Sequence, residues 1–136
     1  MHMNISNIKQ IVNYILNKIN ISTIYLFGSV LTERFNDESD IDIAIIPRDE
    51  ISELALFDLC LELGAVLNRD IHMIDFLKTN LILKIEILKN KKIIYCNDAE
   101  KRIYYEALAI SEYGKLNEER EIILKNRYGE NVWTLF

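Results

Sequence analysis

The sequence has few of the residues that break or cross-link a chain. It contains one proline, four glycines and two cysteines in 136 residues. This composition leaves no flexible linker, and we expect a single domain over 1–136 with regular structure and short turns. Cys60 and Cys96 are far apart and have no metal-ligand or disulfide spacing. We interpret them as reduced core thiols of a cytoplasmic protein.

Two further absences exclude classes of partner. No uncharged apolar run approaches the ~18 residues of a membrane span, and the N-terminus lacks the features of a signal peptide. The sequence has fewer basic than acidic residues, 16 Lys and Arg against 21 Asp and Glu, which gives a net charge of −5. We therefore expect no membrane partner and no direct contact with nucleic acid. An acidic protein that handles nucleotides needs a metal as its local counter-charge.

Short runs of β-branched and aromatic residues predict four strands, over 23–27, 40–46, 70–76 and 91–96. Apolar residues at helical spacing predict helices over 4–20, from an N-cap at Asp49 or Ser52 to about Leu67, and over 80–90. The order predicts an α/β (α+β) fold, a mixed sheet with helices packed on one side and a helical C-terminus.

The C-terminal segment, 97–136, is the candidate surface for a partner. We expect a helix capped by Asn97 or Asp98, with breaks at Gly114 and Gly129. The helix is apolar over a wide arc, and the last six residues include Trp and Phe, which are favoured anchors of protein interfaces.

Two aspartates stand out in the second predicted strand, where an isolated charge on a core face is costly. Asp40 and Asp42 are two residues apart, so they share one face. Such a carboxylate pair suits Mg²⁺ or Mn²⁺. Upstream, with ten residues between Ser29 and Asp40, the Gly28 backbone and the Ser29 hydroxyl can hold phosphate oxygens. A phosphate cradle that faces two carboxylates is typical of metal-assisted nucleotidyl transfer.

The pattern of Gly28-Ser29, ten residues and Asp40-x-Asp42 resembles the DNA polymerase β-like nucleotidyltransferase superfamily. The short chain further resembles the minimal nucleotidyltransferases (MNT), the antitoxin half of HEPN–MNT toxin–antitoxin pairs. The resemblance implies a Mg²⁺-dependent transfer of AMP from ATP to a tyrosine of a partner HEPN ribonuclease, which silences the toxin. It also implies that Gly28 and Ser29 bind the nucleotide and that Asp40 and Asp42 are metal ligands and catalytic residues.

The chain departs from the family at the third carboxylate, which lies on a neighbouring strand in the superfamily. Aligning "RDIHMIDF" places His72 at that position. His72 is either a histidine at the edge of the core or a general base in place of the carboxylate. Asp70 shares its face, whereas Asp75 has the opposite strand parity.

Basic residues near the motif are the remaining candidates for nucleotide binding. Arg34 and Arg48 could reach triphosphate oxygens, and Arg34 is the better placed, between cradle and carboxylates. Lys89, Lys91 and Lys92 form a basic turn, which we interpret as a solvated helix end.

Three functions stay open at this point. The first, which we prefer, is a protein adenylyltransferase that acts on a toxin. The second is an antitoxin that inhibits its toxin by binding alone, with catalysis weakened by His72. The third is nucleotide transfer to a small hydroxylated molecule, for which the chain has little room to build an acceptor pocket.

Overall fold

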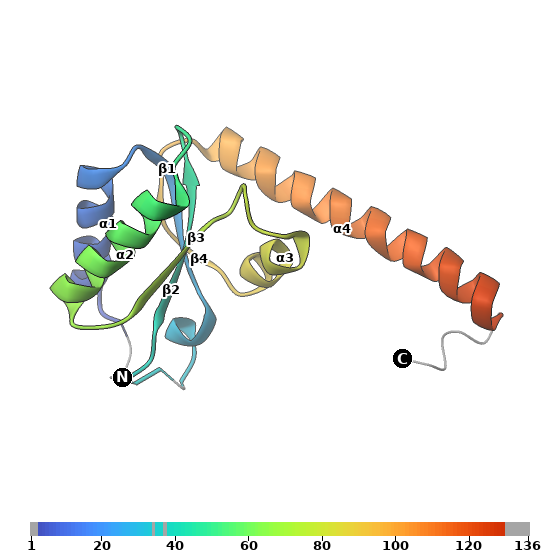
Figure 1. Cartoon of the computed structure of the whole chain (residues 1–136), viewed down its shortest axis with the longest axis horizontal. Coiled ribbons are helices and arrows are strands. Elements are labelled where there is room, and N and C mark those ends of the chain that lie inside the picture. Colours follow the sequence, from blue (N-terminus) through green and yellow to red (C-terminus); the bar gives the residue numbers. More distant parts are fainter. Residues whose placement is uncertain (1–2, 34, 37, 130–136) are drawn as a thin grey trace.

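The computed structural model describes residues 3–33, 35–36 and 38–129, and its elements follow the predicted order (Figure 1). The strands are β1 (Ile21–Phe27), β2 (Ile41–Pro47), β3 (Ile71–Asp75) and β4 (Lys92–Cys96). The helices are α1 (Ile5–Lys18), α2 (Glu53–Leu67), α3 (Leu81–Lys89) and α4 (Ala99–Tyr128), and a short 3₁₀ helix, η1 (Gly28–Leu31), follows β1.

The four strands form one mixed sheet in the order β3-β2-β1-β4. β1 pairs antiparallel with β2 and β4, whereas β2 pairs parallel with β3. The side chains of β1 are buried along its whole length. The two central strands, β1 and β2, therefore set the positions of the edge strands β4 and β3 that pair with them.

The fold class is the predicted one, but the helices lie on both faces of the sheet rather than on one (Figure 1). α1 and α2 cover the face that includes Ile24 and Ile43. α3 and the first part of α4 cover the face that includes Tyr25 and Ala44. Both parities of β1 and β2 are apolar, so each face needs its own cover.

Polar side chains start the four α-helices of the described chain. Asn4, Ser52, Asn80 and Asp98 each accept a hydrogen bond from a backbone N–H three residues on. This satisfies one of the donors that a helix leaves free at its N-terminus. Of the alternative caps, the structure selects Ser52 and Asp98.

α4 runs without a break through Gly114, where we predicted one. A glycine costs a helix ~1 kcal/mol relative to alanine, which is too little to end a helix among good helix formers. The helix does end at Gly129, whose φ of 80° suits a residue without Cβ. Beyond α3 the helix projects away from the sheet (Figure 1). No helix in the described ranges has both the length and the apolar composition needed to cross a bilayer.

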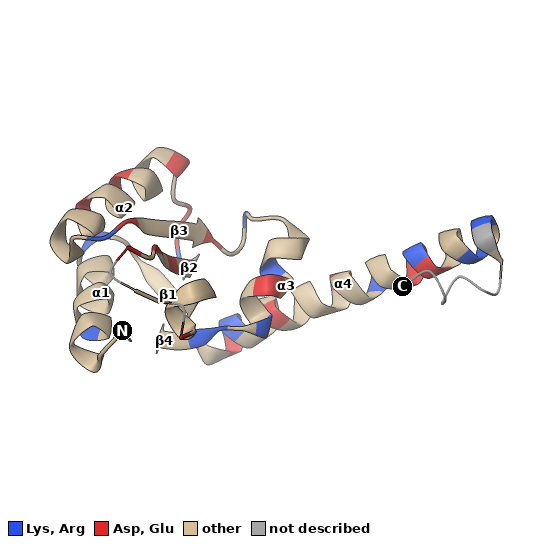
Figure 2. Cartoon of the chain, turned by 90° about the horizontal axis from the view of Figure 1, so that it is seen from below, with Lys and Arg blue, Asp and Glu red and all other residues tan. Residues whose placement is uncertain are grey.

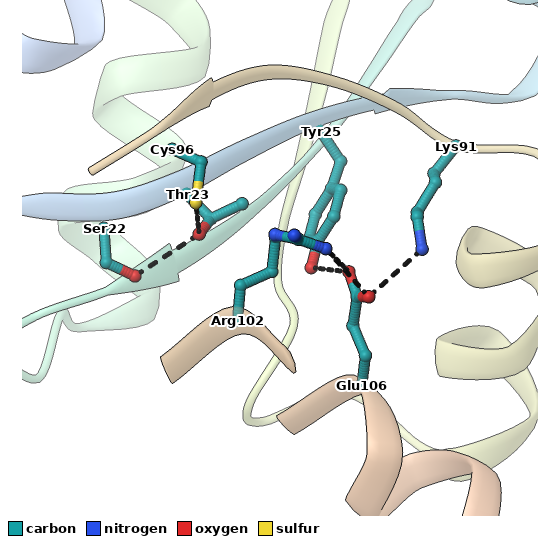
Figure 3. A network of polar contacts seen from close by, with 7 residues as sticks. All are labelled: Ser22, Thr23, Tyr25, Lys91, Cys96, Arg102 and Glu106. Carbon is teal, nitrogen blue, oxygen red and sulfur yellow. Dashed lines mark hydrogen bonds and ion pairs between the residues drawn. The ribbon is translucent and has the colours of Figure 1, made fainter. Parts of the chain in front are cut away.

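A buried polar cluster attaches α4 to the sheet (Figure 3). The Glu106 carboxylate accepts hydrogen bonds from the Tyr25 hydroxyl at 2.7 Å, Arg102 Nη1 at 3.0 Å and Lys91 Nζ at 3.2 Å. Burial alone would raise the pKa of Glu106, but these three donors lower it. Burial and the neighbouring Glu106 raise the pKa of Tyr25. Glu106 is thus an anion at neutral pH, held by two cations and a phenol.

Candidate active site

Three strands bring the predicted site residues together at one end of the sheet. Phe27, the last residue of β1, pairs with Asp42, and Asp42 pairs with His72 of β3. Paired residues share a face, which here is the face covered by α3 and α4. The site therefore spans the point where β1 ends and where β2 and β3 begin.

Gly28 lies directly against the Asp42 carboxylate. Its φ of 76° is in the left-handed region, and a Cβ at this position would collide with Asp42 Oδ2. The next residue, Ser29, is half-buried in η1, and its carbonyl accepts hydrogen bonds from Thr32 N at 3.0 Å and Thr32 Oγ1 at 2.9 Å. The predicted cradle therefore lies next to Asp42, one of the two predicted carboxylates.

The two aspartates differ in their surroundings. Asp42 is within β2 and its side chain is 25% exposed, whereas Asp40 is exposed and lies just before the strand rather than in it. The hydrogen bonds between β2 and β3 begin at the residue after Asp40, where Ile41 N donates to the carbonyl of Asp70 at 3.0 Å. Burial raises the pKa of Asp42, His72 opposes this, and the charge of Asp40 adds to it.

His72 faces this carboxylate from the edge strand. Its Nδ1 is 3.4 Å from Asp42 Oδ1, and its side chain is 65% exposed. The exposure excludes a role in packing the core. An accessible imidazole beside a carboxylate can accept a proton from an incoming hydroxyl.

The other two candidates for a third carboxylate occupy different positions. Asp70 is exposed and precedes β3, with the same strand parity as His72. Asp75 is buried on the opposite face, and its Oδ1 accepts a hydrogen bond from Leu77 N at 2.9 Å. Asp75 therefore shapes the turn after β3 and does not belong to the site.

The two arginines that were candidates for nucleotide binding are not found at the site in the described residues. Arg34 lies outside the described residues. Arg48 follows the far end of β2, about 20 Å along the strand from Asp42 at 3.3 Å per residue, and its guanidinium binds Asn97 Oδ1. We therefore exclude Arg48 from the site.

Arg69 is a residue that the sequence did not single out. Its Nη1 donates to the carbonyls of Asn36 at 2.8 Å and Ser39 at 3.1 Å, and its guanidinium lies 4.3 Å from the centroid of the Phe35 ring. These contacts order the loop that leads to Asp40. They join residues 30 or more positions apart, so no local pattern could have predicted them.

Comparisons with known proteins identify the family of this chain. The sequence profile of the family described as polymerase beta, nucleotidyltransferase matches residues 9–100, more than half of the chain. The chain belongs to this nucleotidyltransferase family. It is also similar to the protein adenylyltransferase MntA of Shewanella oneidensis, with 28% identity over 101 residues that cover 74% of this chain and 72% of MntA.

Solved structures extend the likeness of this nucleotidyltransferase to the whole fold. A chain in a crystal structure of a toxin–antitoxin with AMP-PNP superposes with a TM-score of 0.78 and 26% identity, over 88% of this chain and 97% of that one. A chain in the structure of a tri-AMPylated Shewanella oneidensis HEPN toxin in complex with an MNT antitoxin gives a TM-score of 0.75 and 25% identity. It covers 91% of this chain and 98% of that one.

The donor set of this nucleotidyltransferase suits a hard cation. Asp40 and Asp42 offer carboxylate oxygens, and the backbone of Gly28 is close enough that a phosphate held there would adjoin the same cation. Within the described ranges no group of three or more His, Cys, Asp or Glu side chains could hold a metal by itself. Mg²⁺ needs no such cage, because it usually takes one or two carboxylates and completes its shell with water and substrate phosphates.

Two hollows adjoin the site. A hollow of about 390 Å³ lies beside Gly28 and is lined also by Leu31, Thr32, Asn90 and Lys91. A larger one of about 920 Å³ runs between α2 and the edge strand β3 and reaches His72. Asp42 lines neither hollow, and Gly28 connects the smaller one to the Asp42 carboxylate.

Proposed function

We propose that this chain is an antitoxin that transfers AMP from ATP, with Mg²⁺, to a tyrosine of a HEPN ribonuclease toxin and so neutralises it. The protein partner and the nucleotide are supported by the relatives. One is named a protein adenylyltransferase, and others are structures of a toxin–antitoxin with AMP-PNP and of a tri-AMPylated HEPN toxin with an MNT antitoxin.

The observation that carries the proposal is the contact between Gly28 and the Asp42 carboxylate, with His72 Nδ1 3.4 Å from the same carboxylate. Nucleotidyl transfer needs the phosphate, the metal ligands and a proton acceptor within reach of one another. The proximity of Gly28, Asp42 and His72 at three strand ends supports these roles.

In the proposed step the tyrosine oxygen attacks the α-phosphorus of ATP. A bond forms between them, the bond from the α-phosphorus to the bridging oxygen breaks, and pyrophosphate leaves with its electron pair. The tyrosine proton passes to the imidazole of His72, while the Gly28 and Ser29 backbone orients the phosphates. A Mg²⁺ bound by Asp40 and Asp42 would neutralise the charge that develops on the phosphate oxygens.

α4 is the proposed surface for the toxin. Its exposed face carries large apolar side chains beyond those that pack on the sheet: Ile103, Tyr104, Leu108, Ile110, Ile122 and Ile123. The last six residues, which we also expected to hold the partner, lie outside the described part of the chain. Exposed apolar and aromatic side chains are typical of a docking surface, and such a surface would present the acceptor hydroxyl to a separate catalytic centre.

The test is intact-mass spectrometry of a HEPN protein co-expressed with this chain. We expect the toxin to gain one or more AMP masses on a tyrosine, located by peptide mapping, and to lose its ribonuclease activity. The double variant Asp40→Asn, Asp42→Asn should leave the toxin unmodified. An unmodified toxin with the wild-type chain and saturating ATP would refute the proposal.

Inhibition by binding alone is the second candidate, and the presence of His72 where the family has a carboxylate favours it. An imidazole is a poor ligand for Mg²⁺. On this alternative the toxin is inhibited at equimolar antitoxin without any change in its mass.

A further inference from the structure

Lys91 lies at the same end of the sheet as Gly28, on the side of β1 away from Asp42. β4 pairs antiparallel with β1, with Leu26 opposite Lys92. The preceding residue, Lys91, therefore lies beside the end of β1, and it lines the hollow of about 390 Å³ together with Gly28. Figure 2 shows basic residues gathered where β4 begins, next to α3 and α4.

Lys91 also projects from the same face of the sheet as Asp42. Its Nζ contacts Glu106 of α4, and α4 covers the face on which Phe27 and Asp42 lie. Asp42 and Lys91 are separated by β1, so their backbones are about 10 Å apart at 4.7–4.9 Å per strand. A triphosphate with its α-phosphate at Asp42 and its next phosphate at Gly28 would continue towards Lys91.

The polar cluster around Lys91 carries an excess of positive charge. Glu106 is its one anion, and it faces two cations, Arg102 and Lys91 (Figure 3). Glu106 keeps the shorter hydrogen bonds from Tyr25 and Arg102 if Lys91 turns away. The Lys91 side chain is 26% exposed, and a lysine ammonium has three donors on a flexible stem. Lys91 can therefore bind a phosphate without leaving Glu106 unpaired.

The hollow beside Gly28 contains one charged side chain that could bind an anion. Among the described residues that line it, Lys91 alone is charged, and the others are Gly28, Leu31, Thr32 and Asn90. The chain has a net charge of −5, so it repels a triphosphate that approaches Asp40 and Asp42. A cation near the terminal phosphates would offset this repulsion.

We propose that Lys91 binds the terminal phosphates of the nucleoside triphosphate and that Glu106 holds Lys91 beside the Gly28 cradle in the absence of nucleotide. The proposal rests on the proposed function and adds to it a subsite for the phosphates that leave as pyrophosphate. The basic turn that we interpreted as a solvated helix end is thus divided, with Lys91 facing the site and Lys92 facing away.

The test is calorimetric titration of the full chain with ATP and with AMP, each in the presence of Mg²⁺. We expect Lys91→Met to weaken ATP binding by about 10-fold or more, the effect of a lost charge-assisted hydrogen bond. AMP binding should change less than about 2-fold, because AMP lacks the phosphates that Lys91 contacts. Lys92→Met is the matched control, because Lys92 is exposed and its side chain belongs to the other face of β4. It should bind ATP as the wild type does.

The outcomes separate this proposal from the proposed function. If the wild type binds ATP and Lys91→Met binds it equally well, the subsite is refuted and the nucleotidyltransferase stands. An equal loss in Lys91→Met and Lys92→Met, or an equal loss for ATP and AMP, also refutes it. A wild type that does not bind ATP refutes both. If Lys91→Met does not fold, Lys91→Gln, which can still donate to Glu106, replaces it in the same titration.

Discussion

Asp42 is in an environment that disfavours its own charge. Burial raises the pKa of this carboxyl, the charge of Asp40 adds to the effect, and His72 offsets only part of it. A carboxylate that is poorly compensated in the free protein has more to gain from a bound cation than a fully paired one. The cost of placing two aspartates at a strand end is thus consistent with a ligand site.

Replacing both carboxylates should separate binding from stability. We expect Asp40→Asn, Asp42→Asn to lose Mg²⁺-dependent ATP binding and to melt at or above the wild-type temperature, because the change removes a repulsion and a partly buried charge. Calorimetry and thermal unfolding measure the two effects. Asp58→Asn, an exposed change on α2, serves as control. Equal ATP binding by the double variant would remove the metal site from this position.

His72 should act through chemistry and not through packing. We expect His72→Ala to lower the single-turnover rate of AMP transfer by ~10²-fold, the usual effect of losing a general base, and His72→Asp to retain or raise it. Because the side chain is 65% exposed, the free energy of unfolding should change by no more than about 0.5 kcal/mol. An unchanged rate in His72→Ala would exclude the imidazole as the base and make Asp70→Asn the next variant to measure.

Strand parity explains which positions of site residues could be predicted from the sequence. The period of two placed Asp42, His72 and Asp75 on their observed faces, since it depends only on local geometry. The positions of Lys91 and Arg69 could not be predicted in this way. Lys91 depends on β4 pairing with β1, and Arg69 on a loop 30 or more residues earlier in the chain.

At the scale of elements, the sequence predicted the strands and helices to within a few residues, because hydrophobic spacing and caps such as Ser52 are local signals. The break at Gly114 was wrong because helix propensity is a small free energy that neighbouring residues override. The distribution of helices over both faces was also missed, since it follows from strand order and from the cover that each face requires.

The attachment of α4 to the sheet should depend on pH through Glu106. Its pKa is lowered in the folded state, so between the folded value and the ordinary value of 4.5 the unfolded chain binds more protons. The stabilisation is therefore complete above that ordinary value and is lost as the pH falls through the folded one. Glu106→Gln should destabilise the protein by about 3 kcal/mol at pH 7, as expected for one partner removed from a buried ion pair.

Urea unfolding of this variant at several pH values makes the comparison. The difference from wild type should shrink as the pH falls below 4.5, and Glu112→Gln, an exposed change on the same helix, should show no such trend. A difference that is constant from pH 7 to pH 3 would mean that Glu106 stabilises α4 by packing rather than by charge.

For the whole molecule, the main feature is the separation of the candidate active site from the part of α4 that projects beyond α3 (Figure 1). Ile122→Ser with Ile123→Ser should weaken co-purification of the toxin by about 10-fold or more, as expected for interface anchors, while ATP binding stays intact. Both side chains are about 60% exposed, so the fold should be unaffected. Glu119→Gln is the control on the same turn. Full recovery of the toxin with the double variant would exclude this part of α4 as the dock.

α4 also determines how the molecule diffuses. A helix of 30 residues is about 45 Å long. A compact chain of 136 residues has a radius of gyration of about 14 Å, which corresponds to a sphere about 36 Å across. Since only the first part of α4 packs on the sheet, the free chain is elongated (Figure 1). It should elute from a size-exclusion column ahead of globular standards of 16.0 kDa. A monomer would then be mistaken for a dimer, so the subunit ratio of any complex has to come from light scattering or sedimentation equilibrium.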